Sequence, residues 1–242
     1  MPVCRFPSPL VIIETVKRRK RSGRSAKGFI IIKGVLLFMS VQNQNASPKK
    51  VGTYDIVAVG LMAALCFAAI YIKIDIPTPM GKTMIHLGNT VCLLSGMLLG
   101  GLRGGLAAGV GTMFYDLTDP AFVAGAPFTF LFKFIMAFIA GVVSRSGGAE
   151  GKSLPKNITG CVLGEVAYII LYLGKSFISS YYLQKNALEA VMGSLVTKLM
   201  SSTINAVIAI VASILLLPAF ITVMKKSGVY GKIFPPKPAA EV

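Results

Sequence analysis

The chain has 242 residues, of which 54% are hydrophobic and 14% are charged, and its mean hydropathy is +0.72. This composition excludes an ordinary soluble domain of this size and is typical of a protein that crosses a membrane several times. The net charge of +16 does not indicate nucleic-acid binding. Half of it, +8, falls in residues 1–38, and most of the remainder lies in loops and in the C-terminal tail, where basic residues set membrane topology.

Residues 1–38 form a basic extension that fits no standard segment. A basic run, 17–24, precedes an apolar stretch that is too short to span a bilayer and is interrupted by Lys33, and no small-residue cleavage site follows. One hypothesis is that this extension is not translated and that the protein starts at Met39. Lys33-Gly34-Val35 can be encoded by AAAGGAGTG, a bacterial ribosome-binding sequence. The alternative is a genuine basic arm at the membrane surface.

Apolar runs between residues 54 and 224 predict an all-α integral membrane domain of six transmembrane helices. The expected spans are 54–72, 84–101, 106–116, 128–144, 158–179 and 191–224. Residues 39–53 are then a cytoplasmic N-terminal segment, and 225–242 a basic cytoplasmic tail. Pro77 and Pro79 predict an irregular loop between the first two spans. The second and third spans are short, which indicates either polar ends inside an outward-opening cavity or helices longer than these bounds.

The distribution of lysine and arginine predicts that both termini lie inside the cell. Basic residues are concentrated on one side of the expected spans, and such loops usually face the cytoplasm. The inner set is Lys49, Lys50, Arg103, Arg145, Lys152, Lys156, Lys225, Lys226, Lys232 and Lys237. The outer set is Lys73, Lys82 and Lys185, with Lys175 at the interface. The loop at 73–84 is therefore expected outside the cell.

Small residues recur at intervals of four in the first three spans. Gly60, Ala64 and Ala68 form one such series, and Gly96/Gly100 and Gly101/Gly105/Gly109 form two more. Small residues on one face let another helix approach closely. That helix can belong to this bundle or to a partner protein, and both readings stay open.

The sequence contains no recognisable catalytic or metal-binding motif. It has no nucleophile elbow, no HExxH motif and no Walker loop, and the glycine-rich run 101–109 lacks GK[ST]. One histidine does not support a metal site. Cys4, Cys66, Cys92 and Cys161 have neither metal nor redox spacing and are interpreted as small apolar residues. We therefore expect neither enzyme activity nor a cofactor.

Three ionisable residues lie inside the expected spans, namely Lys133, Glu165 and Lys198. Charges in a bilayer are costly and usually face a cavity or one another. The rise per residue places Glu165 level with Asn205, with Tyr168 and Tyr172 on the same face as Glu165. Two readings stay open: a structural ion pair between Glu165 and Lys198, or a set of groups that converge on a polar solute.

His86 and Asn89 stand at the head of the second expected span, on one face of the helix. The predicted topology puts them at the outer mouth of the bundle. A lone histidine near an interface can be an ordinary anchor or a ligand contact. Asn89, one turn deeper, favours a polar mouth.

Three stretches resemble one family of transport proteins. They are IHLGNTVCLLSGMLLGGLRGGLAAGVGTMFYDL (85–117), APFTFLFKFIMAFIAG (126–141) and GEVAYIILYLGKSF (164–177). In their order and layout they resemble the substrate-binding S component of energy-coupling factor (ECF) vitamin transporters, and in particular the branch named for riboflavin uptake. The resemblance covers residues 50–225.

The resemblance implies a six-helix protein, with both termini inside, that binds a vitamin near the outer face of a bacterial cytoplasmic membrane. It implies that the loop at 73–84 gates the site. It also implies that an AxxxA pattern, here Ala64 and Ala68, contacts a membrane coupling subunit, which with two cytoplasmic ATPases supplies the energy. The residues expected to contact the vitamin are His86, Asn89, Asp116, Lys133, Glu165, Tyr168, Lys198 and Asn205.

The substrate and two other functions remain open at this stage. Riboflavin is the first candidate, and pyridoxine-like compounds, a thiamine pyrimidine precursor and pantothenate are others. An alternative function is a self-sufficient secondary transporter with Glu165 as a proton-coupling carboxylate, which predicts an inverted repeat that the sequence does not display. A membrane scaffold without ligand does not account for Lys133, Glu165 and Lys198.

Overall fold

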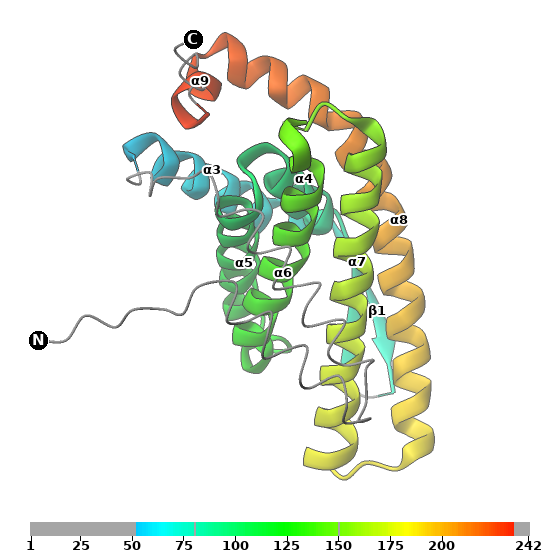
Figure 1. Ribbon diagram of the computed structural model, residues 1–242. Coiled ribbons are helices and arrows are strands. Elements are labelled where there is room, and N and C mark those ends of the chain that lie inside the picture. Colours follow the sequence, from blue (N-terminus) through cyan, green and yellow to red (C-terminus); the bar gives the residue numbers. More distant parts are fainter. Residues whose placement is uncertain (1–51, 80, 150, 235–242) are drawn as a thin grey trace, which may run out of the picture. The chain divides into compact units, whose positions relative to one another are not determined.

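The computed structural model describes residues 52–79, 81–149 and 151–234. The hypotheses on residues 1–38, most of the segment 39–53 and the last part of the tail lie outside the described residues. Six long helices follow one another in the described part of the chain (Figure 1). They are α3 (Thr53–Ile70), α4 (Gly88–Leu99), α5 (Gly101–Thr118), α6 (Ala126–Ser144), α7 (Leu154–Phe177) and α8 (Leu188–Lys226).

Shorter elements join these helices. They are β1 (Lys73–Thr78), β2 (Gly81–His86), η1 (Val123–Gly125), η2 (Ser146–Gly148), η3 (Ile178–Leu183) and α9 (Val229–Ile233). Each predicted apolar run therefore contains one helix, although several helices begin earlier or later than expected.

Four helical segments are long and apolar enough to cross a membrane. They are Thr53–Ile70, Val123–Ser144, Leu154–Leu183 and Leu188–Lys226. The chain is thus a largely helical membrane protein, as its composition predicts. The C-terminal part of α8, which contains Pro218, bends over the end of the bundle toward α9 (Figure 1).

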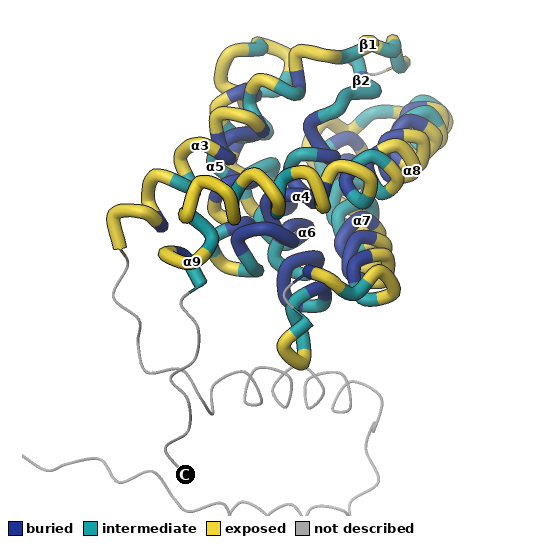
Figure 2. Tube along the Cα trace, turned by 90° about the horizontal axis from the view of Figure 1, so that it is seen from above, coloured by how far each residue is buried: buried dark blue, intermediate teal, exposed yellow. Residues whose placement is uncertain are grey.

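The shortest of the six helices, α4, lies in the middle of the bundle. All its residues except Val91 are buried, and Figure 2 shows α4 enclosed by more exposed helices. A helix surrounded by protein does not need the length or hydropathy of one that faces lipid. The short second span is explained in this way, and its residues Leu93 and Met97 form part of the core with Met136 of α6.

The third span was predicted too short. Helix α5 begins at Gly101, five residues before the expected start, because a single residue makes the turn from α4. Gly100 has a φ of +85°, a conformation that glycine adopts without strain. The helix ends at Thr118 and so has 18 residues, equivalent to about 27 Å.

The segment between α3 and α4 is a β-hairpin, so the prediction of an irregular loop in an all-α protein was wrong at this point. Strands β1 and β2 pair antiparallel, with Lys73 opposite His86 and Pro77 opposite Lys82. The hairpin has only two strands, so Pro77 sits at an edge where its missing N–H is tolerated. The alternation of Ile74 and Ile76 with polar residues was the overlooked signal. Because the second helix begins only at Gly88, His86 does not share a helical stripe with Asn89.

Two of the three series of small residues have different roles. Gly101, Gly105 and Gly109 pack against α6, where a Cβ would come within about 3 Å of backbone carbonyls. This series mediates internal packing. Residues Gly60, Ala64 and Ala68 of α3 are instead exposed, so the interpretation of that series as internal packing is wrong.

The end of the bundle opposite the hairpin is held together by two arginines. Arg103, beside the α4–α5 turn, forms an ion pair of 3.1 Å with Asp55 at the start of α3 and donates to the carbonyl oxygen of Ile233 in α9. The guanidinium group of Arg145 donates to the carbonyl of Leu98, at 3.1 Å, and lies 3.7 Å from the centre of the Phe234 ring. The basic residues at this end therefore join α3, α4, α6 and α9.

The close packing of α4 against α6 predicts that Gly96→Ala destabilises the fold. A Cβ at Gly96 would clash with the backbone carbonyl oxygen of Ala137, so backbone would have to move. Overpacking of this kind costs about 1–3 kcal/mol, and we expect the thermal midpoint in detergent to fall by about 2–10 °C. The matched control is Gly60→Ala, where nothing lies within 4 Å of the added Cβ. Equal midpoints for the two variants would contradict the packing model.

Candidate functional site

A cavity lies beside the hairpin, at the end of the bundle where α4 begins. The hairpin and helices α3, α5, α6, α7 and α8 all contribute to its wall. The lining residues are Ile70, Thr83, Met84, His86, Thr112, Tyr115, Asp116, Phe122, Thr129, Phe132, Lys133, Tyr168, Tyr172, Ser202 and Asn205. Aromatic side chains with a few polar groups are the usual wall of a site for a small molecule.

The aromatic part of the wall is centred on two tyrosines of α7. Tyr168 and Tyr172 are one helical turn apart, and their rings stack with centroids 5.8 Å apart. The ammonium group of Lys133, from α6, lies 3.4 Å from the centre of the Tyr168 ring. This is a close cation–π contact, and burial strengthens it. Together the three side chains place two stacked aromatic rings and a positive charge on the cavity wall.

A buried amide connects the two charges that the sequence places inside the membrane domain. Asn89 of α4 donates from its Nδ2 to both carboxylate oxygens of Glu165, each at 3.2 Å. The Nζ of Lys133 in turn donates to Oδ1 of Asn89. All three side chains are buried. A buried charge is tolerated only when it is paired or hydrogen-bonded, and here one amide serves both ions.

Asn205 of α8 fastens the hairpin to the bundle. Its Oδ1 accepts a hydrogen bond from the backbone N–H of His86, at 2.8 Å, and its Nδ2 donates to the carbonyl of Met84, at 2.9 Å. His86 has a second task, because its Nδ1 accepts from the backbone N–H of Gly88, at 3.0 Å. This bond satisfies one of the free N–H groups at the start of α4, so the imidazole acts as a cap.

Lys198 lies away from the cavity wall. Its Nζ contacts the hydroxyl of Ser176 at 3.4 Å and lies 5.9 Å from the centre of the Tyr172 ring. Within the described ranges no salt bridge joins Lys198 to Glu165, so the predicted structural ion pair between them is wrong. Glu165 is paired instead through Asn89.

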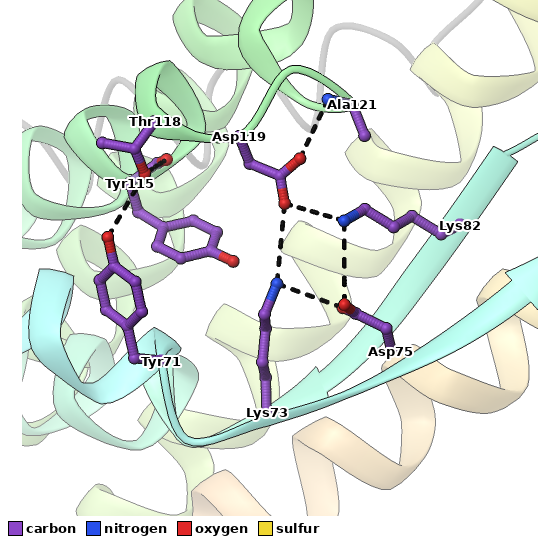
Figure 3. Close-up of polar contacts among 8 residues, drawn as sticks. All are labelled: Tyr71, Lys73, Asp75, Lys82, Tyr115, Thr118, Asp119 and Ala121. Carbon is purple, nitrogen blue, oxygen red and sulfur yellow. Dashed lines mark hydrogen bonds and ion pairs between the residues drawn. The ribbon is translucent and has the colours of Figure 1, made fainter.

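An ionic network ties the hairpin to the loop after α5 (Figure 3). Asp119 accepts from Lys82 at 2.9 Å and lies 3.6 Å from Lys73. Asp75, on β1, lies 3.3 Å from Lys73 and 3.8 Å from Lys82. Two carboxylates and two ammonium groups therefore alternate around a ring. The network lies next to the cavity wall, because the ammonium groups of Lys73 and Lys82 each lie 5.4 Å from the ring centre of a lining residue, Tyr115 and Phe122 respectively.

The network changes the protonation of two of its members. The hydrogen bond from Lys82 holds the pKa of Asp119 below its ordinary value. Hydrogen bonding of the Lys73 ammonium group to Tyr115, and to a smaller extent to Asp75, raises the pKa of Lys73. Both shifts favour the charged forms. Asp119 therefore stabilises the closed hairpin above about pH 4 and loses this effect below it, whereas Lys73 loses its effect only when the pH rises above about 10.

The structure brings most of the expected site residues together. His86, Asp116, Lys133, Tyr168 and Asn205 line the cavity, and Asn89 and Glu165 lie directly behind Lys133. Lys198 is the one expected contact that lies apart. Five further residues of the wall were not indicated by the sequence, namely Thr83, Met84, Tyr115, Phe122 and Phe132. The spacing of Tyr168 and Tyr172 indicated that they share one helix face. The position of Phe122 was not predictable, because it follows an irregular loop that has no periodic pattern.

The cavity is small in the described conformation, at about 70 Å³. Sites for small molecules usually measure about 300–1,000 Å³. A solute of vitamin size therefore requires the hairpin or the lining side chains to move. Among the described residues, no group of three or more His, Cys, Asp or Glu side chains is placed to hold a metal ion.

The model of the family described as ECF-type riboflavin transporter, S component, matches residues 50–222. This stretch includes the hairpin, every residue that lines the cavity and nearly all of α8. No curated protein matches the chain. No solved structure matches it either.

The ionic ring predicts that Asp119→Asn loosens the hairpin. The variant replaces the acceptor of two ammonium groups with a neutral amide. Partly exposed ion pairs contribute about 0.2–1 kcal/mol each, so the loss of two should lower the hydrogen-exchange protection of residues 73–86 about two- to thirtyfold. The control is Glu189→Gln, which removes an exposed negative charge from the first turn of α8, outside the ionic ring.

The same ring predicts a flat pH response. Because both pKa shifts favour the charged forms, protection factors of residues 73–86 should be constant from pH 5 to 8. A titration midpoint inside this range, or unchanged protection in Asp119→Asn, would show that the ring does not hold the hairpin.

Proposed function

Because the chain belongs to the family of S components of ECF-type riboflavin transporters, we propose that it captures a water-soluble vitamin or a related precursor, with riboflavin as the first candidate. Members of this family are substrate-binding subunits of transporters and are not enzymes. The observation that carries the proposal is the cavity beside the hairpin, which combines stacked aromatic rings with a few buried polar groups.

We propose that helices α3 to α8 all cross the bacterial cytoplasmic membrane and that both termini lie inside. Helices α4 and α5 are not among the four segments that are long and apolar enough to cross a membrane by themselves. Helix α4 is surrounded by protein, and α5 packs against α6 through its glycines. The proposed orientation puts the arginine-rich end in the cytoplasm and the hairpin outside. The cavity then faces the side from which an imported solute arrives.

In the proposed binding mode, a planar ring of the solute lies against Tyr168 and Tyr172, where stacking supplies affinity. Asp116 and Lys133, from facing helices, offer an acceptor and a donor to its polar groups. Asn89 and Glu165 act behind Lys133, since they fix its ammonium group. Contact between the solute and Lys198 remains a prediction of the sequence.

The hairpin is proposed to act as the gate. It forms part of the cavity wall, and it is fastened by Asn205 on one side and by the ionic ring with Asp119 on the other. Hydrogen bonds and partly exposed ion pairs of this kind can break and re-form at modest cost. Entry of a vitamin requires such an opening, because the closed cavity is about 70 Å³.

The partners are proposed to be an ECF membrane coupling subunit and two cytoplasmic ATPases. Ala64 and Ala68 lie on the exposed face of α3, with large apolar neighbours such as Leu61. A face with small residues at intervals of four allows close approach of a foreign helix. The chain has no ATP-binding motif of its own, so energy for uptake comes from the partners.

The proposal is tested by purifying the chain alone and identifying small molecules that co-purify by mass spectrometry. One vitamin per chain is expected, with uptake in cells only when the coupling subunit and ATPases are co-expressed. Uptake without partners that collapses on addition of a protonophore would instead establish the proton-coupled transporter.

A matched pair of lysines tests the site. We expect Lys133→Met to weaken vitamin binding at least about tenfold, since a charge-assisted hydrogen bond contributes about 1.5–3 kcal/mol. Lys198→Met removes the same charge from a residue outside the cavity wall and should change affinity less. Isothermal titration of both variants, with thermal midpoints to confirm folding, distinguishes them; a larger loss for Lys198→Met would contradict the assigned cavity.

The partner face is tested by Ala64→Trp. The bulky ring should block docking of the coupling subunit, so that complex recovery and uptake are lost while vitamin affinity is unchanged. Ile170→Trp, at an exposed apolar position of α7, is the control and should assemble normally. Normal uptake by Ala64→Trp would show that α3 does not carry this interface.

A further inference from the structure

A second cavity lies at the opposite end of the bundle from the hairpin, between the start of α7 and the last part of α8. Its volume is about 350 Å³, within the usual range of ligand sites. The lining residues are Gly151, Lys152, Leu154, Asn157, Ile214, Leu217, Pro218, Ile221 and Thr222. The floor is mainly aliphatic, and none of these residues belongs to the vitamin site.

Two polar acceptors at this cavity lack their expected partners. Asn157 is 4% exposed, and its Nδ2 donates to the carbonyl of Gly151 at 2.7 Å, yet its Oδ1 has no hydrogen-bond partner among the described residues. The carbonyl of Ile214 cannot receive its usual helical bond, because Pro218 has no N–H. A buried acceptor such as Oδ1 of Asn157 is normally satisfied, so the cavity favours a molecule with hydroxyl or amine donors.

The rim of the cavity carries positive potential. The N-terminus of α7, a helix of 24 residues, lies at this cavity. The side chain of Ser153, the N-cap residue, makes no capping hydrogen bond there. Free N–H groups at a helix start attract anions. Lys152, which is exposed, adds a full positive charge to the same rim. An anionic group is therefore favoured directly beside the two acceptors.

Apolar surface continues from the cavity along both helices. Leu154 is exposed at the start of α7, and Leu215 and Leu216 are exposed on α8, next to the cavity residues Leu217 and Ile221. In a membrane protein such surface faces acyl chains. The ligand that matches all three properties has one anionic phosphate, hydroxyl donors on its headgroup and hydrocarbon tails.

We propose that this second cavity is a binding site for an anionic phospholipid with a hydroxylated headgroup, of which phosphatidylglycerol is the simplest. The phosphate lies at Lys152 and the N-terminus of α7, the headgroup hydroxyls donate to Asn157 and the Ile214 carbonyl, and an acyl chain follows Leu217 and Ile221. The site is separate from vitamin capture and requires only that the chain resides in a membrane. Either proposal can therefore fail without the other.

Native mass spectrometry of the purified full chain, with equal amounts of phosphatidylglycerol and phosphatidylcholine added in detergent, tests the proposal. We expect one phosphatidylglycerol to be retained in about fivefold preference, which corresponds to the ~1 kcal/mol typical of one basic residue at an anionic lipid. Phosphatidylmethanol, which has the same charge but no headgroup hydroxyl, should be retained less than phosphatidylglycerol.

Two variants and one control localise the effect. Lys152→Gln should abolish the preference, and Ile221→Trp should reduce retention by filling the cavity without a change of charge. Lys226→Gln removes an exposed charge from the last turn of α8, outside the cavity, and should retain the preference. Equal retention of phosphatidylcholine, equal retention of phosphatidylmethanol, or the same loss in Lys226→Gln as in Lys152→Gln would each overturn the proposal.

Discussion

The structure depends on one buried amide. Asn89 stands between the ammonium group of Lys133 and the carboxylate of Glu165, and through these bonds it joins α4, α6 and α7. Two opposite charges in a membrane domain could simply form an ion pair. With an amide between them, both ions are hydrogen-bonded, while Lys133 keeps its face toward the Tyr168 ring and the cavity. The charge needed at the wall of the site is thus supplied by the interaction that holds three helices together.

The sequence made this set of helices and much of the site predictable, because both follow from periodicity and from the cost of buried charge. Lys133 and Glu165 are conspicuous in apolar runs, and Tyr168 follows Glu165 on the same helix face. Their partner was not predictable. Whether Glu165 pairs with Lys198 or with Asn89 depends on which helices are neighbours, and helical spacing carries no information about that.

The errors at the head of α4 have a different cause. Two prolines argued for irregular structure, but an isolated hairpin has edges on both sides and accommodates Pro77. Once β2 continues to His86, the histidine belongs to the strand and its ring caps the next helix. Local composition therefore identified His86 as unusual. Its role depends on the tertiary position of the hairpin, which is fixed by Asn205, 119 residues later in the chain.

Helix α8 links the two ends of the molecule. Its N-terminal half contributes Ser202 and Asn205 to the first cavity, and its C-terminal half contributes Ile214 and Pro218 to the second. If the hairpin opens as proposed, both hydrogen bonds of Asn205 to β2 must break together with the ionic ring at Asp119. At about 1 kcal/mol for each hydrogen bond, the opening costs a few kcal/mol, which is enough to keep the site closed most of the time. An affinity is net of this cost, so a solute that binds with micromolar affinity makes contacts that offset the opening and leave about 8 kcal/mol to hold it. The polar contacts of the hairpin are therefore strong enough to close the cavity and weak enough to be displaced by the ligand that the cavity is proposed to bind.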